Sequence, residues 1–460
     1  MTSTKPSGMK TFTLIWVGQV FSLFGSAMTQ FALTIWAYQV TEKATVLALV
    51  GFFGFAPMVL ISPIAGVLVD RWNRKLTMMI SDIATGMATA ILLVLYTTGN
   101  LQIWHLYVLS AFSGLFQAFQ WPAYSAAISL LIPKTQYARA SGMMSLAQYG
   151  AGILAPITAA ALLKPIGING IMIIDLLTLA LAIVTLLIAA IPAMERVLAE
   201  GEKQPSIWRD SLFGFKFIFN RPGLFWLQMI FFMGNFMASL GGVLINPMIL
   251  ASTGQSATML SVVQSAGAIG GVVGGLIIAS WGGFKQKVEG VLLGWMAAGL
   301  MGFMFIGTAK GVGWIWVIGN LMFAAITPII NASNQAIWQS KVPPQMQGRV
   351  FSVRMMIATI TAPLAMLAAG PLADKVFEPA LRVTTSAWSH SFGGLVGTGP
   401  GTGMALILVF SGLLMVLVGA IGYIIPSVRN IEKILPEEHQ VVLTNGNTLI
   451  YDILIVATGS

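Results

Sequence analysis

The sequence has no cysteine and very few charged residues. Among its 460 residues, cysteine is absent, histidine occurs three times and charged residues make up only 8%. The missing cysteine excludes a disulfide scaffold, a thiolate metal site and a cysteine nucleophile, and three histidines leave little for zinc. A soluble domain carries about 25% charged residues. The composition therefore predicts a membrane protein with no metal, no cofactor and no catalytic residues, rather than an enzyme.

Long apolar runs recur along the sequence. Hydrophobic residues make up 57% of the chain, and runs long enough to cross a bilayer, about 20 residues, recur along it. We expect an all-α polytopic membrane protein with twelve transmembrane helices in two groups of six. The predicted spans are 12–38, 45–69, 76–97, 103–131, 142–163 and 167–192, then 223–250, 257–281, 288–308, 314–340, 349–372 and 401–426.

The charged residues divide the chain and orient it. With twelve spans, nineteen of the 24 lysines and arginines fall on one side of the membrane and five on the other. Because cytoplasmic loops carry the excess of Lys and Arg, we expect both termini in the cytoplasm and the protein in the plasma (inner) membrane. The predicted organisation is a bundle at 1–192, a cytoplasmic linker at 193–222, a second bundle at 223–426 and a cytoplasmic tail at 427–460.

The two halves repeat each other at an offset close to 210 residues. The matching pairs are Trp16 and Trp226, Gly66 and Gly275, Pro133 and Pro343, and Pro156 and Pro363. Parallel six-helix repeats that hold substrate near the bilayer midplane are the architecture of one large class of secondary transporters. The repeat therefore favours a transporter whose substrate lies between the halves.

The loop after the second span reads GVLVDRWNRK, which places Gly66, Asp70, Arg71, Arg74 and Lys75 in the order G-x-x-x-D-R-x-x-R-K. Glycine lets neighbouring helices approach closely, and the acid and bases can form an ion cluster that latches one conformation. The alternative is an ordinary positively charged loop. This pattern resembles the signature loop of the major facilitator superfamily.

The fifth span carries a second pattern, AGILAPITAA, which includes Gly152, Ala155 and Pro156. It resembles the exporter motif G-x-x-x-G-P-x-x-G-G of the same superfamily, with alanine at each of the glycine positions. Proline bends a helix and small residues allow close packing, so the motif is interpreted as a hinge. The alternative is plain helix packing.

The chain to about residue 435 resembles the macrolide-efflux-like, drug:proton antiporter branch of that superfamily. The stretches LIPKTQYARASGM and NQAIWQSKVPPQMQGRVFSVR carry the resemblance beside the loop at 66–75. It implies export of lipophilic cationic or neutral drugs driven by the proton gradient. We also expect a monomer without a nucleic-acid partner, because the orientation of the protein accounts for the excess of positive charge. Siderophore or lysophospholipid transport by the same fold is the alternative. The chain departs from the better-known drug:proton antiporters, which carry an arginine within the fourth span. Residues 76–133, which include that span here, contain no arginine or lysine.

Two acids lie within predicted spans, Asp82 about 10 Å from one end of span three and Asp175 at a similar depth in span six. A carboxylate inside the membrane faces the bundle interior or a cavity and is a functional candidate. Both are therefore candidates for proton coupling. The alternative is a hydrogen bond between helices near each helix end.

Amides and aromatic residues occur at intervals within the spans that are expected to line a cavity. An aromatic pocket with a few amides suits large amphipathic substrates of varied shape, whereas the alternative role of each amide is to join two helices. The substrate-cavity candidates are Gln19, Phe24, Gln30, Phe116, Gln117, Gln120, Asn235, Asn331 and Asn334.

Two segments of the second half are not predicted spans. The segment around 373–400, with the glycine-rich stretch GGLVGTGPGTG, is expected to be a flexible loop rather than a nucleotide site. In the tail, 441–444 and 447–450 flank Asn445-Gly446 and predict a β-hairpin, followed by a strand at 452–457. The last 20 or so residues resemble a fragment of flavin-dependent pyridine-nucleotide oxidoreductases, which leaves a membrane-anchored flavin enzyme as a remote alternative.

Overall fold

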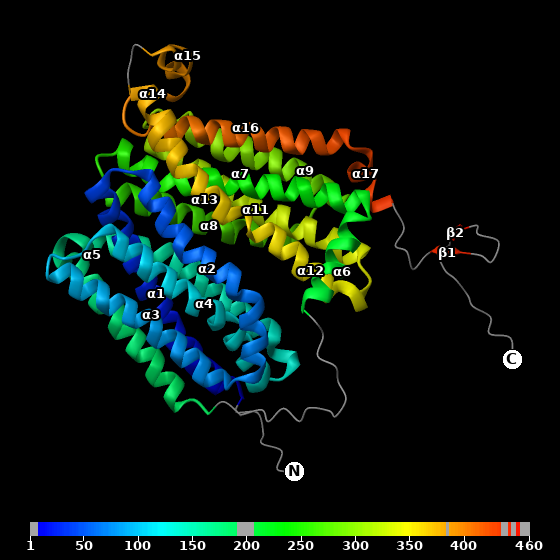
Figure 1. The fold of residues 1–460 in the computed structure, drawn as a ribbon, viewed down its shortest axis with the longest axis horizontal. Coiled ribbons are helices and arrows are strands. Elements are labelled where there is room, and N and C mark those ends of the chain that lie inside the picture. Colours follow the sequence, from blue (N-terminus) through cyan, green and yellow to red (C-terminus); the bar gives the residue numbers. More distant parts are fainter. Residues whose placement is uncertain (1–7, 191–206, 383–385, 434–439, 443–447, 451–460) are drawn as a thin grey trace.

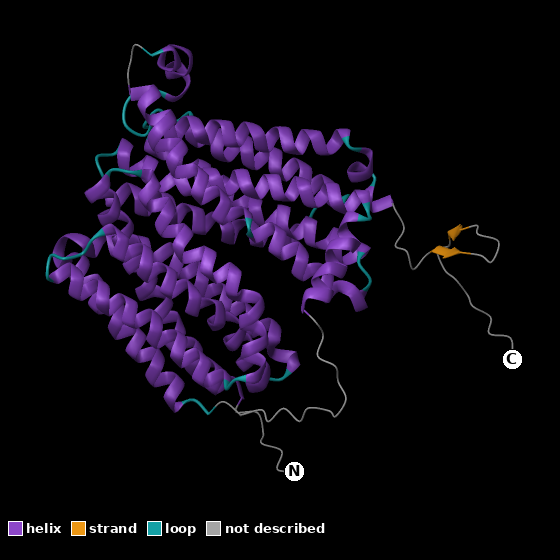
Figure 2. Cartoon of the chain, in the orientation of Figure 1, coloured by secondary structure: helices purple, strands orange, loops and turns teal. Residues whose placement is uncertain are grey.

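The computed structural model describes residues 8–190, 207–382, 386–433, 440–442 and 448–450, and within 66–75 it leaves out the side chains of Val67, Asp70 and Arg71. Nearly all of the described chain before 434 is helical (Figure 2). The first half contains α1 (Gly8–Thr41), α2 (Ala44–Arg71), α3 (Arg74–Thr97), α4 (Ile103–Leu131), the 3₁₀ turn η1 (Lys134–Gln136) and α5 (Tyr137–Ile188).

The second half has shorter pieces because several of its membrane crossings are interrupted. It begins with α6 (Ile207–Phe219), α7 (Pro222–Ser252), α8 (Ala257–Trp281), α9 (Lys287–Ala297), the π-helical η2 (Ala298–Met304), α10 (Phe305–Gly307) and α11 (Gly313–Lys341). It continues with α12 (Pro344–Thr359), α13 (Thr361–Leu372), the π-helical η3 (Ala373–Phe377), α14 (Glu378–Arg382), α15 (Ala387–Val396), α16 (Thr402–Ile424), α17 (Pro426–Arg429) and η4 (Ile431–Lys433).

Glycine and proline account for two irregular crossings. The long helix α5 contains two crossings joined at Gly167, whose backbone (φ 66°, ψ −175°) is not helical. Between α12 and α13 the helix breaks at Ile360, because Pro363 has no N–H to donate to the carbonyl four residues earlier.

Ten helical segments among the described residues are long and apolar enough to cross a membrane. One of them, 139–188, contains the two arms of α5. The 29-residue α4 is not among the ten, because glutamines and serines lower its hydropathy. With both arms of α5 and with α4 included, the twelve predicted spans are accounted for, and the all-α polytopic fold is confirmed.

The helices form two groups that lie side by side (Figure 1). In the first, α1 packs along α5, and α4 packs against α2 and α3. In the second, α8 packs along α11, and α7 packs against α13 and α16. The domain boundaries at 192, 222 and 426 stay predictions, and 191–206 of the linker lies outside the described residues.

Each bundle has two ends, which we name after one residue at each. The Lys75 end carries the short connections after α2, α4, α8 and α11. The Asp374 end carries the connections after α1, α3, α7 and α10. The ribbons of the two groups converge where α2 meets α13 and diverge toward α12 and α6, at the Lys75 end (Figure 1).

The prediction of a flexible loop over 373–400 is wrong for most of its length, because η3, α14 and α15 occupy it. Side chains stabilise these helix starts. Ser386 accepts a hydrogen bond from the N–H of Ser389 at the start of α15 (3.0 Å), and Glu378 accepts from Gly401 and Met404 at the start of α16 (both 3.2 Å). Capping side chains supply partners that the first turn of a helix lacks.

The tail contains the strands β1 (Gln440–Val442) and β2 (Thr448–Ile450), which pair antiparallel with Val441 opposite Leu449. This pairing confirms the predicted hairpin strands. The turn at 445–446 and the strand predicted at 452–457 lie outside the described residues.

Glycines let helices approach closely, as at α8 and α11. A Cβ atom added at Gly274 would meet the backbone carbonyl of Ala325 on α11, whereas one added at the neighbouring Gly275 would meet nothing within 4 Å. Gly274→Ala is therefore expected to lower stability by about 1–3 kcal/mol through overpacking. Gly275→Ala should be neutral or gain up to ~1 kcal/mol from helix propensity.

Thermal unfolding of the purified protein in detergent, followed by tryptophan fluorescence, checks this prediction. Equal midpoints for the two variants would show that the approach of α8 to α11 is not limited by the missing side chain.

Candidate functional site

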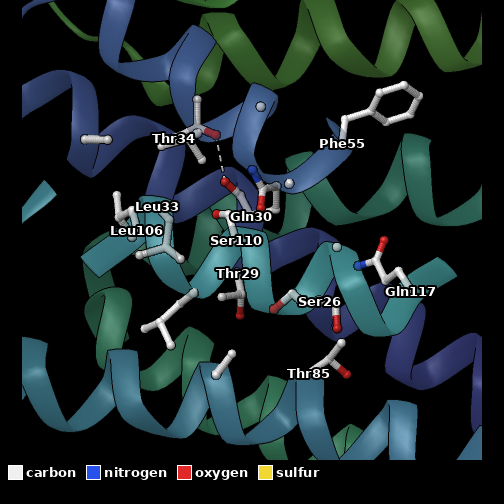
Figure 3. Close-up of a pocket in the computed structure, with 18 of the residues that line it drawn as sticks. Ser26, Thr29, Gln30, Leu33, Thr34, Phe55, Thr85, Leu106, Ser110 and Gln117 are labelled. Carbon is white, nitrogen blue, oxygen red and sulfur yellow. Dashed lines mark hydrogen bonds between the residues drawn. The ribbon is translucent and has the colours of Figure 1, made fainter. Parts of the chain in front are cut away.

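A cavity of about 600 Å³ lies among α1, α2, α3, α4 and α5 and is also lined by residues of α7 and α13 from the second half. Most of its lining side chains are apolar, including Leu33, Phe55, Met58, Leu106, Val243 and Met366. Its polar lining includes the amides Gln30, Gln117 and Asn246, the hydroxyl groups of Ser26, Ser110 and Thr85, and the carboxyl group of Asp175. Figure 3 shows Gln30, Ser110, Gln117 and Phe55 around this space.

Asp175 is the acid of the cavity wall. It lies in the second arm of α5, and its side chain is 3% exposed. Its two oxygens accept hydrogen bonds from Ser26 on α1 (2.9 Å) and from Thr89 on α3 (3.2 Å). Hydroxyl donors are weak compensation for a charge out of water. The carboxyl group can therefore take up a proton or a cationic group at the cavity wall.

Asp82 has a different environment. Gln19 of α1 donates to one carboxylate oxygen (2.9 Å) and Gln120 of α4 donates to the other (2.8 Å), and Gln120 also lies 3.2 Å from the Oε1 of Gln19. Asp82 is 6% exposed and is not among the described residues that line the cavity. The three side chains join α1, α3 and α4 inside the first bundle. This agrees with the alternative role given above to the acid and to the amides, which is to form hydrogen bonds between helices.

The remaining cavity candidates are scattered. Gln30 and Gln117 line the cavity, but Phe24, Phe116 and Asn235 are half-buried outside its lining. On α11, Asn331 is exposed and Asn334 is completely buried. The sequence interpretation missed Asn246, whose Oδ1 accepts from Gln264 (3.2 Å). Asn246 could have been predicted in the same way as Asn235, because both are amides within the apolar run 223–250.

In the signature loop, Lys75 has a defined partner. Its ammonium group donates to the carbonyl oxygens of Leu187 and Ala189 (both 2.9 Å) at the end of α5. A cation at the carboxyl end of a helix satisfies free carbonyls and interacts favourably with the helix dipole. Gly66 has open space where a Cβ would lie. Because the side chains of Asp70 and Arg71 lie outside the description, the latch stays a prediction.

The exporter-like motif lies where α5 meets α8 of the other bundle. A Cβ added at Gly152 would lie 3.2 Å from the Cβ of Ala268, and Ala155 is completely buried. Pro156 weakens the helical hydrogen bonds of the preceding turn, and Ser265 donates to the Ile153 carbonyl there (2.7 Å). The small residues thus bring two bundles together, while the hinge role stays a prediction.

At the Asp374 end, one bundle caps a helix of the other. The carboxylate of Asp374 in η3 accepts hydrogen bonds from the N–H groups of Ala44 (3.0 Å) and Thr45 (2.8 Å), in the first turn of α2. The residue that precedes α2, Lys43, provides no side-chain cap. A Cβ at Gly370 would meet the backbone of Thr45, so α13 lies directly against this helix start. An anion at a helix amino end is stabilising.

Two bundles of helices that lie side by side are the architecture of one large class of secondary transporters. The sequence profile described as the Major Facilitator Superfamily matches residues 15–366. The chain belongs to the Major Facilitator Superfamily. It is thus a multi-pass membrane protein and a secondary transporter rather than an enzyme, and the resemblance predicted from the loop at 66–75 is confirmed.

Among curated proteins, the chain is similar to macrolide efflux protein A of Streptococcus pyogenes, at 27% identity over 371 residues that cover 79% of this chain and 90% of the relative. It is 26% identical to macrolide efflux protein A of Enterococcus faecalis over 319 residues, 68% of this chain and 96% of the relative. The tail after 435 lies beyond the family match, so its likeness to oxidoreductases stays a prediction.

Among solved structures, a bacterial homologue of the human lysosomal transporter Spinster, in an inward-facing and unoccupied conformation, gives a TM-score of 0.64 at 14% identity and covers 94% of this chain and 99% of that chain. A POT family transporter gives a TM-score of 0.66 at 12% identity, with 91% and 97% covered. At these identities the likeness establishes the fold.

Removing the cap at the Asp374 end should open that end. An N-terminal cap contributes about 0.5–2 kcal/mol, so Asp374→Ala is expected to shift the balance between conformations by roughly 2- to 30-fold. Because the chain has no native cysteine, spin labels can be placed at Asn100→Cys and Trp314→Cys, both exposed near this end. The distance distribution should move to longer values.

Lys375→Ala, the exposed neighbour, is the control and should leave the distances unchanged. Unaltered distances in Asp374→Ala would mean that the capping bonds do not hold the bundles together.

Proposed function

We propose that the chain exports lipophilic drugs or similar small molecules by alternating access, coupled to proton antiport. The observation that carries the proposal is the cavity of about 600 Å³ with mainly apolar walls and a few amides and hydroxyl groups. Sites for drug-sized ligands have volumes of about 300–1,000 Å³ and this kind of lining. A lipophilic body gains from the apolar wall, and the few polar groups accommodate substituents without fixing one shape.

The relatives support the same substrate class. The proteins of Streptococcus pyogenes and Enterococcus faecalis that the chain resembles over most of its length are named for macrolide efflux. A large lipophilic substrate of that kind fits an apolar cavity better than a small, strongly hydrated one. Drug export is therefore the activity that both the cavity and the relatives favour.

Proton coupling is supported by the two buried acids. A carboxylate inside the membrane is costly and marks an ion or substrate pathway. Asp175 lies on the cavity wall, where protons and substrate both reach it, whereas Asp82 is enclosed by Gln19 and Gln120. We assign Asp175 the exchange of a proton against substrate and keep Asp82 as the second candidate.

The charge distribution supports one orientation of the protein in the membrane, and the direction of export rests on the likeness to the macrolide efflux proteins. Cytoplasmic connections carry the excess of Lys and Arg, which favours an orientation with the Lys75 end and both termini in the cytoplasm and the protein in the plasma membrane. In this orientation the divergence of the bundles at the Lys75 end corresponds to the state that takes substrate from the cytoplasm.

Uptake of a lipophilic fluorescent dye into inside-out vesicles, with and without an imposed pH gradient, tests the proposal. The gradient should drive accumulation in vesicles with the native protein and not in vesicles without it. Asp175→Asn should lose at least about 90% of this gradient-driven accumulation, because an amide cannot release a proton, while dye exchange without a gradient persists.

Asp82→Asn is measured in parallel, and Glu42→Gln, an exposed acid at the Asp374 end, is the matched control. If only Asp82→Asn uncouples transport, the coupling acid is Asp82. No accumulation across a chemically varied panel of drugs would refute drug export, and siderophores and lysophospholipids would be tested next.

A further inference from the structure

Arg354 is a cation inside the second bundle that has only neutral partners. It lies ten residues after the start of α12 at Pro344, about 15 Å along the helix. Its Nη1 donates to the Oε1 of Gln335 (2.6 Å), and its guanidinium lies 5.3 Å from the ring centre of Trp338 and 5.7 Å from that of Phe351. Within the described part of the chain, no carboxylate forms an ion pair with it.

The glutamine that holds Arg354 belongs to a polar face of α11. Thr327, Asn331, Gln335 and Gln339 recur every fourth residue, so they lie on one side of the helix. Asn331 and Gln339 are exposed and the other two are half-buried. Exposed amides within a membrane-spanning helix avoid lipid and line a water-filled space. This face of α11 therefore borders the opening between the bundles, from mid-helix to the Lys75 end.

The first bundle has the corresponding face on α4. Gln117, Trp121, Ser125 and Ser129 also recur every fourth residue, and all four are exposed. Each lies 210 residues before its counterpart on α11, which is the offset of the sequence repeat. Gln117 also lines the cavity. From their polarity and exposure we infer that the two faces lie on opposite sides of the space between the bundles, toward the Lys75 end.

The cation breaks this symmetry. The residue 210 positions before Arg354 is Met144, which is apolar, so the guanidinium has no counterpart on the first wall. One wall therefore presents a cation beside three amides and one hydroxyl group, and the other presents one amide, a tryptophan and two serines. Such a pathway favours a compound with a lipophilic body and an acidic head, oriented with its head toward the second bundle.

We propose that Arg354, together with Gln335 and Asn331, is the binding site for the anionic head group of an amphiphilic carboxylate that the transporter carries. The planar guanidinium matches a carboxylate with two parallel hydrogen bonds, and the incoming anion replaces the neutral amide of Gln335 as its partner. The proposal rests on the proposed function in that the compound enters through the opening between the bundles, and it narrows the substrate class.

A fluorescent fatty acid, 12-(9-anthroyloxy)stearate, and its methyl ester test this site, because they differ only in charge at the head. Binding to the purified full chain in detergent is followed by energy transfer from tryptophan. The native protein should bind the acid about 10-fold or more tightly than the ester, as expected for a hydrogen bond to a charged group. Arg354→Gln should remove this preference and leave ester binding unchanged, and Arg354→Lys should restore part of it.

Arg349→Gln is the matched control, because Arg349 lies on the same helix but stacks on Phe213 of α6 (5.8 Å). It should keep the preference for the acid. Equal binding of acid and ester by the native protein, or equal weakening of both in Arg354→Gln, would overturn the proposal. A preference that persists in Arg354→Gln would overturn it as well.

These outcomes are separable from those of the proposed function. Preference for the acid in the purified protein, without any gradient-driven dye accumulation in vesicles, would uphold the site and refute cation or neutral drug export. Dye accumulation without that preference would refute the site and uphold the export of drugs.

Discussion

The absence of water from the bilayer core constrains this structure more than any single contact. In hydrocarbon every backbone N–H and C=O group needs a partner within the protein, so the chain crosses as helices. With lipid as apolar as leucine, helices gain little by hiding apolar side chains from it, and close contact depends on small residues. Gly274 against the Ala325 carbonyl and Gly152 against Ala268 are such contacts. Because lipid offers polar side chains no hydrogen bonds, it also favours their placement against a partner, in a cavity or at a helix end.

The absence of water from the bilayer core also explains where the polar side chains of the spans lie. Asp82 is satisfied by two glutamines and joins three helices, whereas Asp175 has only hydroxyl donors and faces the cavity. Lys75 and Asp374 occupy helix ends, where a cation meets free carbonyls and an anion meets free N–H groups. Asp374 differs from Lys75 in that its helix belongs to the other bundle, so this bond must break whenever the bundles separate at that end.

The sequence repeat places a polar face on α4 and a matching polar face on α11. Residues without a counterpart at the 210-residue offset, such as Arg354, make the two faces chemically different. The four-residue spacing of the polar faces on α4 and α11 survives the 210-residue offset even though the residue types have changed. A spacing of four residues keeps the polar side chains on one side of each helix, and in both helices this is the side that we place at the opening. The acid at the cavity wall, Asp175, lies in the first half, and the deep cation, Arg354, lies in the second. The two halves thus contribute different ionisable groups, an acid to the cavity lining and a cation beside Gln335 of α11.

The sequence by itself determined the number of spans, the repeat, the membership of the superfamily and the presence of two acids at membrane depth. These follow from local properties, since apolar length, proline, glycine and motif spacing act within one helix or loop. Which polar residues meet was decided only by the tertiary structure. Gln19 and Gln120, expected in the cavity, hold Asp82, and the cavity takes Asn246 from a helix of the other half. The period of a helix fixes which residues share a face, but the neighbour of that face depends on how all the helices pack.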